Sequence, residues 1–183
     1  MEAIILAGGK AERLATAASG RPKALVPVVG RPLAAYQLAL LRGAGVERVI
    51  VSCAAGQEGL FESELSGLGM EVVTAPEPER LGRGGGLRFA ARARAEEGDV
   101  FALNGDELID VDLSALLDRH RETGAAATIV VAPLPPKVIE PRSRFWIEVS
   151  ESGLMMRAVA VAFCVALAAS VWAAVATPAS ERG

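Results

Sequence analysis

The first quarter of the chain contains residues suited to binding phosphate groups. Gly8 and Gly9 directly follow a short apolar run, where glycines let the backbone approach a ligand with its N–H groups facing phosphate oxygens. Arg13 adds a cation that can bind a triphosphate through charge-assisted hydrogen bonds. A glycine turn after a first strand is common in α/β proteins, so this loop alone does not distinguish a nucleotide site from a structural turn.

Lys23 lies in an otherwise apolar stretch, between Pro22 and Ala24-Leu25. The ammonium group of such a lysine must reach a polar environment. Two interpretations stay open. The side chain extends to the surface, or its charge is fixed on a phosphate group that reacts.

Alternating strand-like and helix-like segments predict the scaffold that positions these residues. Continuous apolar runs predict buried strands at 3–6, 49–51, 72–73, 100–103 and 127–131. Helices are predicted to begin at Pro32, at Leu87 and after the N-cap Asp112, and the arginines at 88, 92 and 94 are predicted to lie on a solvated helix face.

Strands separated by helices imply right-handed crossovers and a mostly parallel sheet. The predicted fold class is therefore α/β, a three-layer domain that is incomplete at its C-terminal side. Ligands bind at the carboxyl ends of the strands in such sheets, so the loops after Leu6, Thr74 and Leu103 are the candidates for a site.

Composition favours one globular domain and argues against some classes of function. The 183 residues are 51% apolar and 22% charged, with a net charge of −3, so we expect no nucleic-acid partner. Cys53 and Cys164 lie far apart and show neither metal-binding nor redox spacing. No signal peptide precedes the first strand, and we expect a cytoplasmic location.

Sequence blocks in a specific order resemble the nucleotidyltransferases that make NDP-sugars. The segment LAGGKAERL…RPKALVPVVGRPLAAYQL is similar to the family signature G-x-G-T-R-L followed by P-K. EPERLGRGGGL, residues 77–87, resembles the second nucleotide loop, and 101–131 resembles the stretch around the metal-binding aspartate. The resemblance covers residues 1–135 and, more faintly, 144–157.

The resemblance implies a Rossmann-like fold and transfer of an NMP group from an NTP to a sugar 1-phosphate, with release of pyrophosphate. Arg13 would bind the β- and γ-phosphates, and Lys23 would neutralise the α-phosphate as it is attacked. Asp106 would hold Mg²⁺, which prefers hard oxygen ligands. The nucleotide-binding residues implied in the same way are Leu6, Ala7, Gly8, Gly9, Glu79, Gly82 and Gly85.

Departures from the family pattern leave alternatives open. Ala11, Glu12 and Arg83 stand where glycine, threonine and threonine are usual, which leaves the base undetermined. The segment that binds the sugar phosphate and the second metal aspartate are not visible, which favours an inactive nucleotide-binding remnant as the alternative function. Within the class, the alternative is transfer to another phosphorylated acceptor, such as a molybdopterin or an alcohol phosphate.

An uncharged apolar run of 19 residues, 158–176, has about the length that crosses a bilayer as a helix. We weigh three explanations: out-of-frame or foreign sequence after a truncation, a membrane anchor, and a buried element of the domain. We favour the first. The chain is then divided into an incomplete nucleotidyltransferase-like domain at 1–157, the apolar segment at 158–176 and a tail at 177–183.

Overall fold

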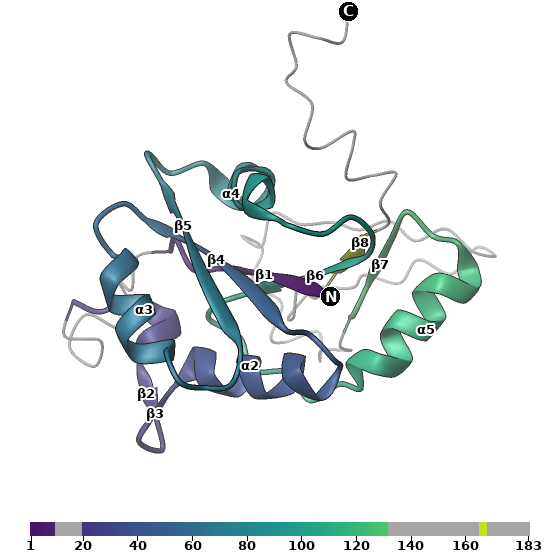
Figure 1. Cartoon of the computed structure of the whole chain (residues 1–183), viewed down its shortest axis with the longest axis horizontal. Helices are drawn as coiled ribbons and strands as arrows, with labels where there is room; N and C mark the ends of the chain where they lie inside the picture. The colour runs from purple at the N-terminus through teal and green to yellow at the C-terminus, as the bar shows by residue number, and fades with distance from the viewer. Residues whose placement is uncertain (10–19, 132–164, 168–183) are drawn as a thin grey trace, which may run out of the picture.

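The computed structural model describes residues 1–9, 20–131 and 165–167, in which one main sheet is covered by helices (Figure 1). The strands of that sheet are β1 (Glu2–Leu6), β4 (Arg48–Ala54), β5 (Glu71–Glu77), β6 (Val100–Asn104), β7 (Ala127–Ile129) and β8 (Val165–Leu167). The helices are α2 (Leu33–Gly43), α3 (Glu58–Leu65), α4 (Gly82–Ala90) and α5 (Leu113–Thr123), with single 3-10 turns η2 (Lys23–Leu25) and η3 (Ala91–Ala93).

The main sheet has the order β5-β4-β1-β6-β8-β7. Strands β5, β4, β1 and β6 are mutually parallel, and β8 pairs antiparallel with both β6 and β7. The register places Leu6, at the end of β1, opposite both Ser52 of β4 and Asn104 of β6. The predicted α/β class with a mostly parallel sheet is confirmed, and the carboxyl ends of four strands meet at one edge.

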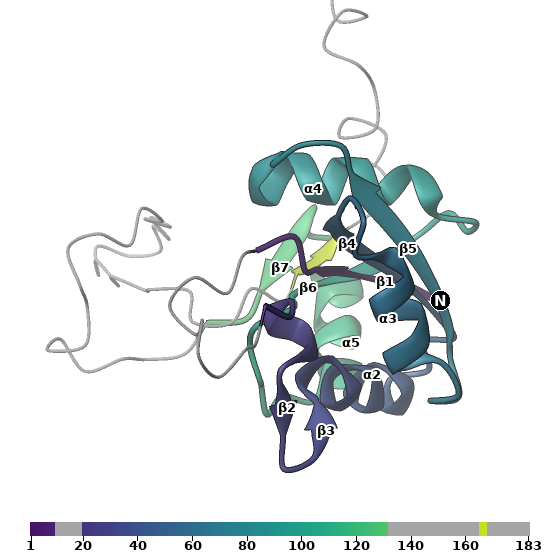
Figure 2. The same cartoon turned by 90° about the vertical axis from the view of Figure 1, so that its left-hand side faces the viewer.

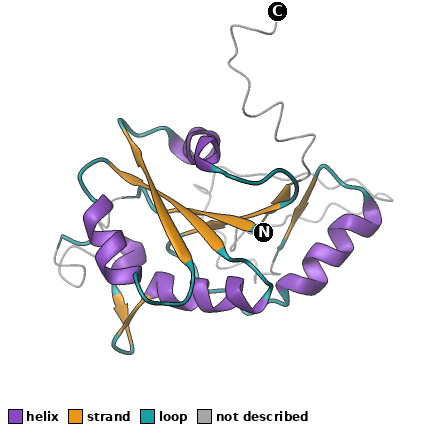
Figure 3. Cartoon of the chain, in the orientation of Figure 1, coloured by secondary structure: helices purple, strands orange, loops and turns teal. Residues whose placement is uncertain are grey.

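Alternate residues of the central strands pack on opposite faces of the sheet, which produces three layers (Figure 3). Ala3 and Ile5 of β1 belong to a core cluster that also includes residues of α2, α3 and α5. Ile4 belongs to a second cluster, which includes Ala90 of α4 and the neighbouring Ala91. Both faces of β1 are therefore buried, as its continuous apolar run predicts.

A short hairpin projects beside α2 (Figure 2). Its strands are β2 (Pro27–Val28) and β3 (Arg31–Pro32), which pair antiparallel. Val29 and Gly30 form the turn and have φ angles of 49° and 76°. The sequence predicts that the next helix begins at Pro32. In the structure, Pro32 is the N-cap residue, and α2 begins one residue later, at Leu33.

The helix boundaries confirm some predictions and correct others. The Asp112 side chain accepts a hydrogen bond from the Ala115 N–H, and Gly124 ends α5 with a φ angle of 60°. Helix α4 begins at Gly82, five residues before the predicted start at Leu87, because the glycine-rich segment is itself helical. Helix α3 is not predicted from the sequence, since it buries only Phe61 and Leu65.

The prediction that Arg94 lies on a solvated face is wrong. Its side chain is only 3% exposed and donates to Glu2, which is 1% exposed. Arg48 and the N–H groups of Ala95 and Glu96 also donate to the Glu2 carboxylate. Burial raises the pKa of Glu2, but these hydrogen bonds outweigh burial and hold its pKa below the ordinary value.

Most of the apolar run 158–176, and all of the segment 144–157 that faintly resembles the family, lie outside the described residues. Val165–Leu167 are described, and they form β8 between β6 and β7. Within the described part of the chain, no helix has the length and hydropathy needed to cross a membrane. The division at residues 157 and 176 remains a prediction.

Replacing Glu2 with Gln should lower the free energy of unfolding by about 3–5 kcal/mol at pH 7, because Arg48 and Arg94 would both lose the buried carboxylate with which they pair. The pKa of Glu2 is depressed in the folded state, so its stabilisation is present above the unfolded pKa near 4.5 and is lost as the pH falls through the folded value. Urea unfolding should therefore show the difference narrowing from pH 7 to pH 3.

Glu71→Gln is the matched control, because Glu71 also pairs with Arg48 but is 63% exposed. It should cost less than about 1 kcal/mol. An equal loss in the two variants, or a Glu2→Gln loss that does not change with pH, would contradict this account of the cluster.

Candidate functional site

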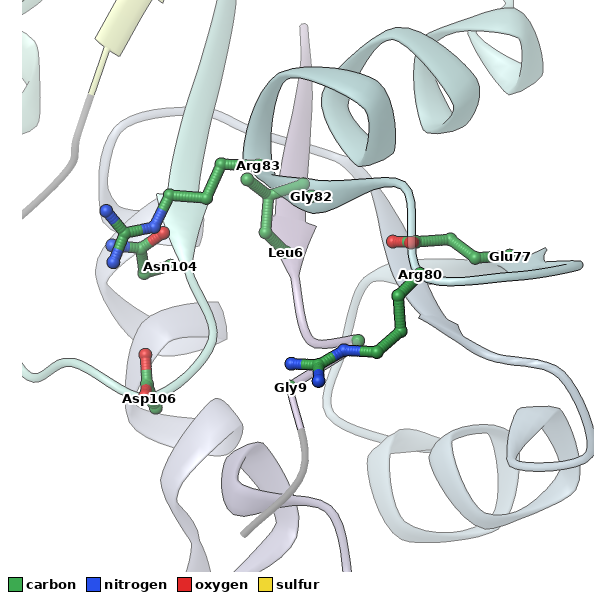
Figure 4. A pocket seen from close by; sticks show the side chains of 9 residues that line it. Leu6, Gly9, Glu77, Arg80, Gly82, Arg83, Asn104 and Asp106 are labelled. Carbon is green, nitrogen blue, oxygen red and sulfur yellow. The ribbon is translucent and has the colours of Figure 1, made fainter. Parts of the chain in front are cut away.

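A pocket lies at the carboxyl ends of the parallel strands (Figure 4). It is lined from the loop after β1, the loop between β5 and α4, and the loop after β6, which are the three loops singled out in the sequence. The lining residues are Leu6, Gly8, Gly9, Glu77, Arg80, Gly82, Arg83, Asn104 and Asp106.

The loop after β6 is held in place by buried hydrogen bonds. The Gln37 side chain of α2 is 2% exposed, and its amide donates to the carbonyl oxygens of Asn104 at 2.6 Å and Glu107 at 2.7 Å. The Asn104 amide donates to the Glu107 carboxylate, and the Gly105 N–H donates to the Leu6 carbonyl at 2.8 Å. These bonds fix the backbone on both sides of Asp106.

Lys23 and Asp106 form an ion pair although 83 residues separate them in the chain. The Lys23 ammonium donates to the Asp106 carboxylate at 2.9 Å, and the two side chains are 27% and 43% exposed. Lys23 begins η2, whose residues Ala24 and Leu25 are buried in the core. Its backbone is therefore anchored while its charge faces the rim of the pocket at Asp106.

Glu77 lies at the other side of the site, at the end of β5. Its carboxylate accepts hydrogen bonds from the Ser52 hydroxyl at 2.6 Å and from the Leu81 N–H at 3.2 Å. In Figure 4, Arg83 extends in the direction of Asn104 and Arg80 in the direction of Gly9. The second loop thus contributes two cations to the pocket lining.

The structure brings together part of the set of site residues predicted from the sequence. Leu6, Gly8, Gly9, Gly82 and Asp106 line the pocket, and Lys23 is bonded to Asp106.

Three other predicted site residues, Ala7, Glu79 and Gly85, are not part of the pocket lining. Ala7 is buried, and its N–H donates to the Ser52 carbonyl. Glu79 is exposed and Gly85 packs on Leu81, and neither is among the lining residues of this pocket. Arg13 lies outside the described residues. The ligand-binding roles of all these residues stay predictions.

Sequence reasoning missed several residues of this site. The apolar pattern predicts that β5 ends at Thr74, and the resemblance places Glu77 in the second nucleotide loop without giving it a role. In the structure, strand pairing continues to Glu77, opposite Ala54. Gln37 carries no signal in the sequence, since its role depends on contacts with a loop that is 67 residues away. Among the described residues, no three His, Cys, Asp or Glu side chains gather as a metal-binding group.

Cys53, next to Ser52 on β4, is fully buried. Burial raises the pKa of its thiol to about 11, and the negative charges of Glu58, Glu77 and Glu62 add to the effect. Because a thiol must lose its proton to act as a nucleophile, Cys53 is a packing residue.

Comparison with known proteins places the chain in a family. Residues 3–176 match the model of the MobA-like NTP transferase domain. The chain is 34% identical over 147 residues to a mannose-1-phosphate guanylyltransferase of Mycobacterium tuberculosis, covering 78% of this chain and 39% of that protein. It is also 34% identical over 137 residues to a D-glycero-alpha-D-manno-heptose 1-phosphate guanylyltransferase of Aneurinibacillus thermoaerophilus, covering 73% and 58% respectively.

Solved structures show the same fold. A UTP-bound UGPase from Acinetobacter baumannii aligns with a TM-score of 0.75 at 20% identity, covering 94% of this chain and 75% of that one. A protein described as a glucose-1-phosphate thymidylyltransferase from Bacillus anthracis aligns with a TM-score of 0.77 at 16% identity, covering 99% and 78%.

Gly105→Ala should destabilise the protein by about 1–3 kcal/mol, because the site leaves no room for a methyl group there. A Cβ atom would lie 3.0 Å from the Leu6 carbonyl oxygen and 3.2 Å from the Cβ atoms of Ala7 and Ala24. Urea unfolding measures this loss. Gly59→Ala in α3 is the control, since a Cβ atom there meets nothing within 4 Å. Unchanged stability of Gly105→Ala would show that the loops are not packed as described.

Proposed function

Since the chain belongs to the MobA-like NTP transferase family, we propose that it transfers an NMP group from an NTP to a sugar 1-phosphate and releases pyrophosphate. The observation that carries the proposal is the Lys23–Asp106 ion pair at the rim of a pocket lined by two glycine loops. Glycine loops leave backbone N–H groups accessible to phosphate oxygens, and the ion pair holds a cation beside them.

The reaction joins two anions, which explains why fixed cations are needed. An oxygen of the sugar phosphate attacks the α-phosphorus of the NTP, and the bond from that phosphorus to the oxygen bridging to the β-phosphate breaks. Charge on the transferring group must be neutralised as this occurs. Lys23 is suited to that role because η2 is anchored in the core and its ammonium is already held at the rim of the pocket. The role proposed for Arg13 is to bind the β- and γ-phosphates.

Asp106 is the residue that we propose for holding Mg²⁺. Its carboxylate lines the pocket and is 43% exposed, so both a carboxylate oxygen and water molecules can reach an ion bound there. This donor set fits Mg²⁺, which keeps several waters and is commonly held by one or two carboxylates together with substrate phosphates. The ion, when bound, would supply positive charge to the phosphates. Asp106 and Lys23 would orient the triphosphate from the protein side.

The relatives favour a sugar 1-phosphate as the acceptor. The two guanylyltransferases are named for mannose 1-phosphate and for a heptose 1-phosphate, and a 30% identical protein of Synechocystis is named UTP–glucose-1-phosphate uridylyltransferase. The chain spans 39% to 58% of the length of the two guanylyltransferases. We propose the acceptor class on this basis, and the base is left to experiment because the relatives differ in it.

Lys23→Ala and Asp106→Asn should each reduce pyrophosphate release at least 100-fold, because each removes a charge at the phosphate site. Pyrophosphate release from GTP, UTP, dTTP, CTP and ATP with several sugar 1-phosphates measures the activity. Thermal unfolding should change little, since both side chains are partly exposed.

Arg119→Ala is the control. This exposed arginine of α5 forms an ion pair with Glu122 in the same helix, and neither residue lines the pocket. It should retain full activity. Normal turnover by either site variant would disprove the assignment of Lys23 or Asp106. Nucleotide binding without turnover of any pair by the unsubstituted chain would exclude the transferase and favour the inactive remnant.

Lys23 and a divalent cation compete for the same carboxylate, so removing the lysine should tighten metal binding. We expect Lys23→Ala to bind Mn²⁺ roughly three- to tenfold more tightly in the absence of nucleotide, because the ammonium no longer neutralises Asp106. Electron paramagnetic resonance of free Mn²⁺ measures the affinity. Asp106→Asn should weaken binding, and Arg119→Ala should leave it unchanged. Equal affinity in Lys23→Ala and the unsubstituted chain would argue against a metal at Asp106.

A further inference from the structure

Glu77 is an unexpected residue in a pocket proposed to bind a triphosphate, because a carboxylate repels phosphate groups. Its two oxygen atoms are directed to the protein. One accepts from the Ser52 hydroxyl at 2.6 Å, and the other accepts from the Leu81 N–H at 3.2 Å. Ser52 is fully buried in β4, and Leu81 directly precedes helix α4. The carboxylate therefore connects the sheet to the second glycine loop.

Two glycines leave the space that this carboxylate fills. A Cβ atom on Gly86 would lie 2.6 Å from the Glu77 Oε1 atom, and a Cβ atom on Gly8 would lie 3.0 Å from the same atom. Gly8 belongs to the first loop, whereas Gly86 lies inside α4, where glycine is less favourable than alanine by about 1 kcal/mol. One carboxylate oxygen is thus enclosed by both loops, which explains a glycine inside the helix.

We propose that Glu77 is a positioning residue of the nucleotide pocket. Its carboxylate connects the second glycine loop to β4 through hydrogen bonds and packs against the first glycine loop. It thereby fixes the spacing between the two loops. Gly8, Gly82 and Glu77 all line the pocket, so a change in this spacing changes the shape of the pocket. This inference deepens the proposed function and rests on it.

Substitution by glutamine separates the positioning role from a role of the charge. In Glu77→Gln, the new side-chain amide could accept from the Leu81 N–H with its oxygen and donate to the Ser52 hydroxyl with its nitrogen. The Ser52 hydroxyl could then donate to the Gly86 carbonyl, which is 3.5 Å away. Glu77→Gln therefore keeps the connection without the charge, whereas Glu77→Ala removes both.

The test uses the full chain and variants Glu77→Ala, Glu77→Gln and Gly86→Ala. Gly59→Ala in α3 is the control, since it also replaces a helical glycine at which a Cβ atom meets nothing within 4 Å, and it lies outside the pocket lining. We expect Glu77→Ala and Gly86→Ala to raise the dissociation constants of Mg·GTP and Mg·UTP, and the KM of the NTP that is used, about tenfold or more, because two hydrogen bonds are lost or displaced. The kcat and the KM of the sugar 1-phosphate should change much less.

Glu77→Gln should bind within about threefold of the unsubstituted chain, and Gly59→Ala should be indistinguishable from it. Unchanged binding by Glu77→Ala would overturn the inference. Equal defects in Glu77→Gln and Glu77→Ala would also overturn it, because the charge itself would then be what matters. If thermal unfolding showed that Glu77→Ala binds less nucleotide only because less of it is folded, Glu77 would be a structural residue and the inference would be overturned.

Hydrogen exchange of residues 78–86 tests the same contact without any ligand. Exchange should accelerate in Glu77→Ala and stay near normal in Glu77→Gln and Gly59→Ala. If the unsubstituted chain bound neither nucleotide, the proposed function would fail while this measurement would still decide whether Glu77 holds the loop. Unchanged exchange in Glu77→Ala would contradict the inference even if the chain were an active transferase.

Discussion

The parallel pairing of β1 between β4 and β6 is the constraint on which the rest of the site depends. It places the end of β1 at Leu6, opposite Ser52 on one side and Asn104 on the other. The chain leaves all three strands at the same edge, so the loops that follow share one space. Two backbone hydrogen bonds extend this pairing beyond the strand end: the Ala7 N–H donates to Ser52, and the Gly105 N–H donates to Leu6.

Charges at this edge are divided between two sides of the pocket. Asp106 and Lys23 form an ion pair on one side, and because both side chains are partly exposed, each can exchange its partner for another charge. Phosphate groups and a divalent cation together could provide both replacements, which couples their binding in our account. On the other side, both carboxylate oxygens of Glu77 accept hydrogen bonds from the protein, one from the Ser52 hydroxyl and one from the Leu81 N–H. The site therefore combines an exchangeable ion pair with a fixed carboxylate.

Much of this arrangement could be predicted from the sequence because the signals are local. A continuous apolar run predicts β1, and the N-cap at Asp112 predicts the start of α5. The alternation of strands and helices predicts that the loops after Leu6, Thr74 and Leu103 share one edge of the sheet. Contacts between distant segments could not be predicted. Arg94 has the pattern of a surface arginine, and only the fold shows that it approaches Glu2, 92 residues away. Gln37 likewise acquires its role from a loop that it meets only in the folded chain.

The central claim is that an NMP group passes intact from an NTP to a sugar 1-phosphate at this site. Phosphorus NMR of the chain with Mg²⁺, an NTP and a sugar 1-phosphate follows every phosphate in the mixture. Our account predicts that the resonances of the two substrates decrease together, while those of an NDP-sugar and pyrophosphate increase in a 1:1 ratio. Formation of orthophosphate with an NDP, or a spectrum that does not change for any of the pairs tested, would contradict it.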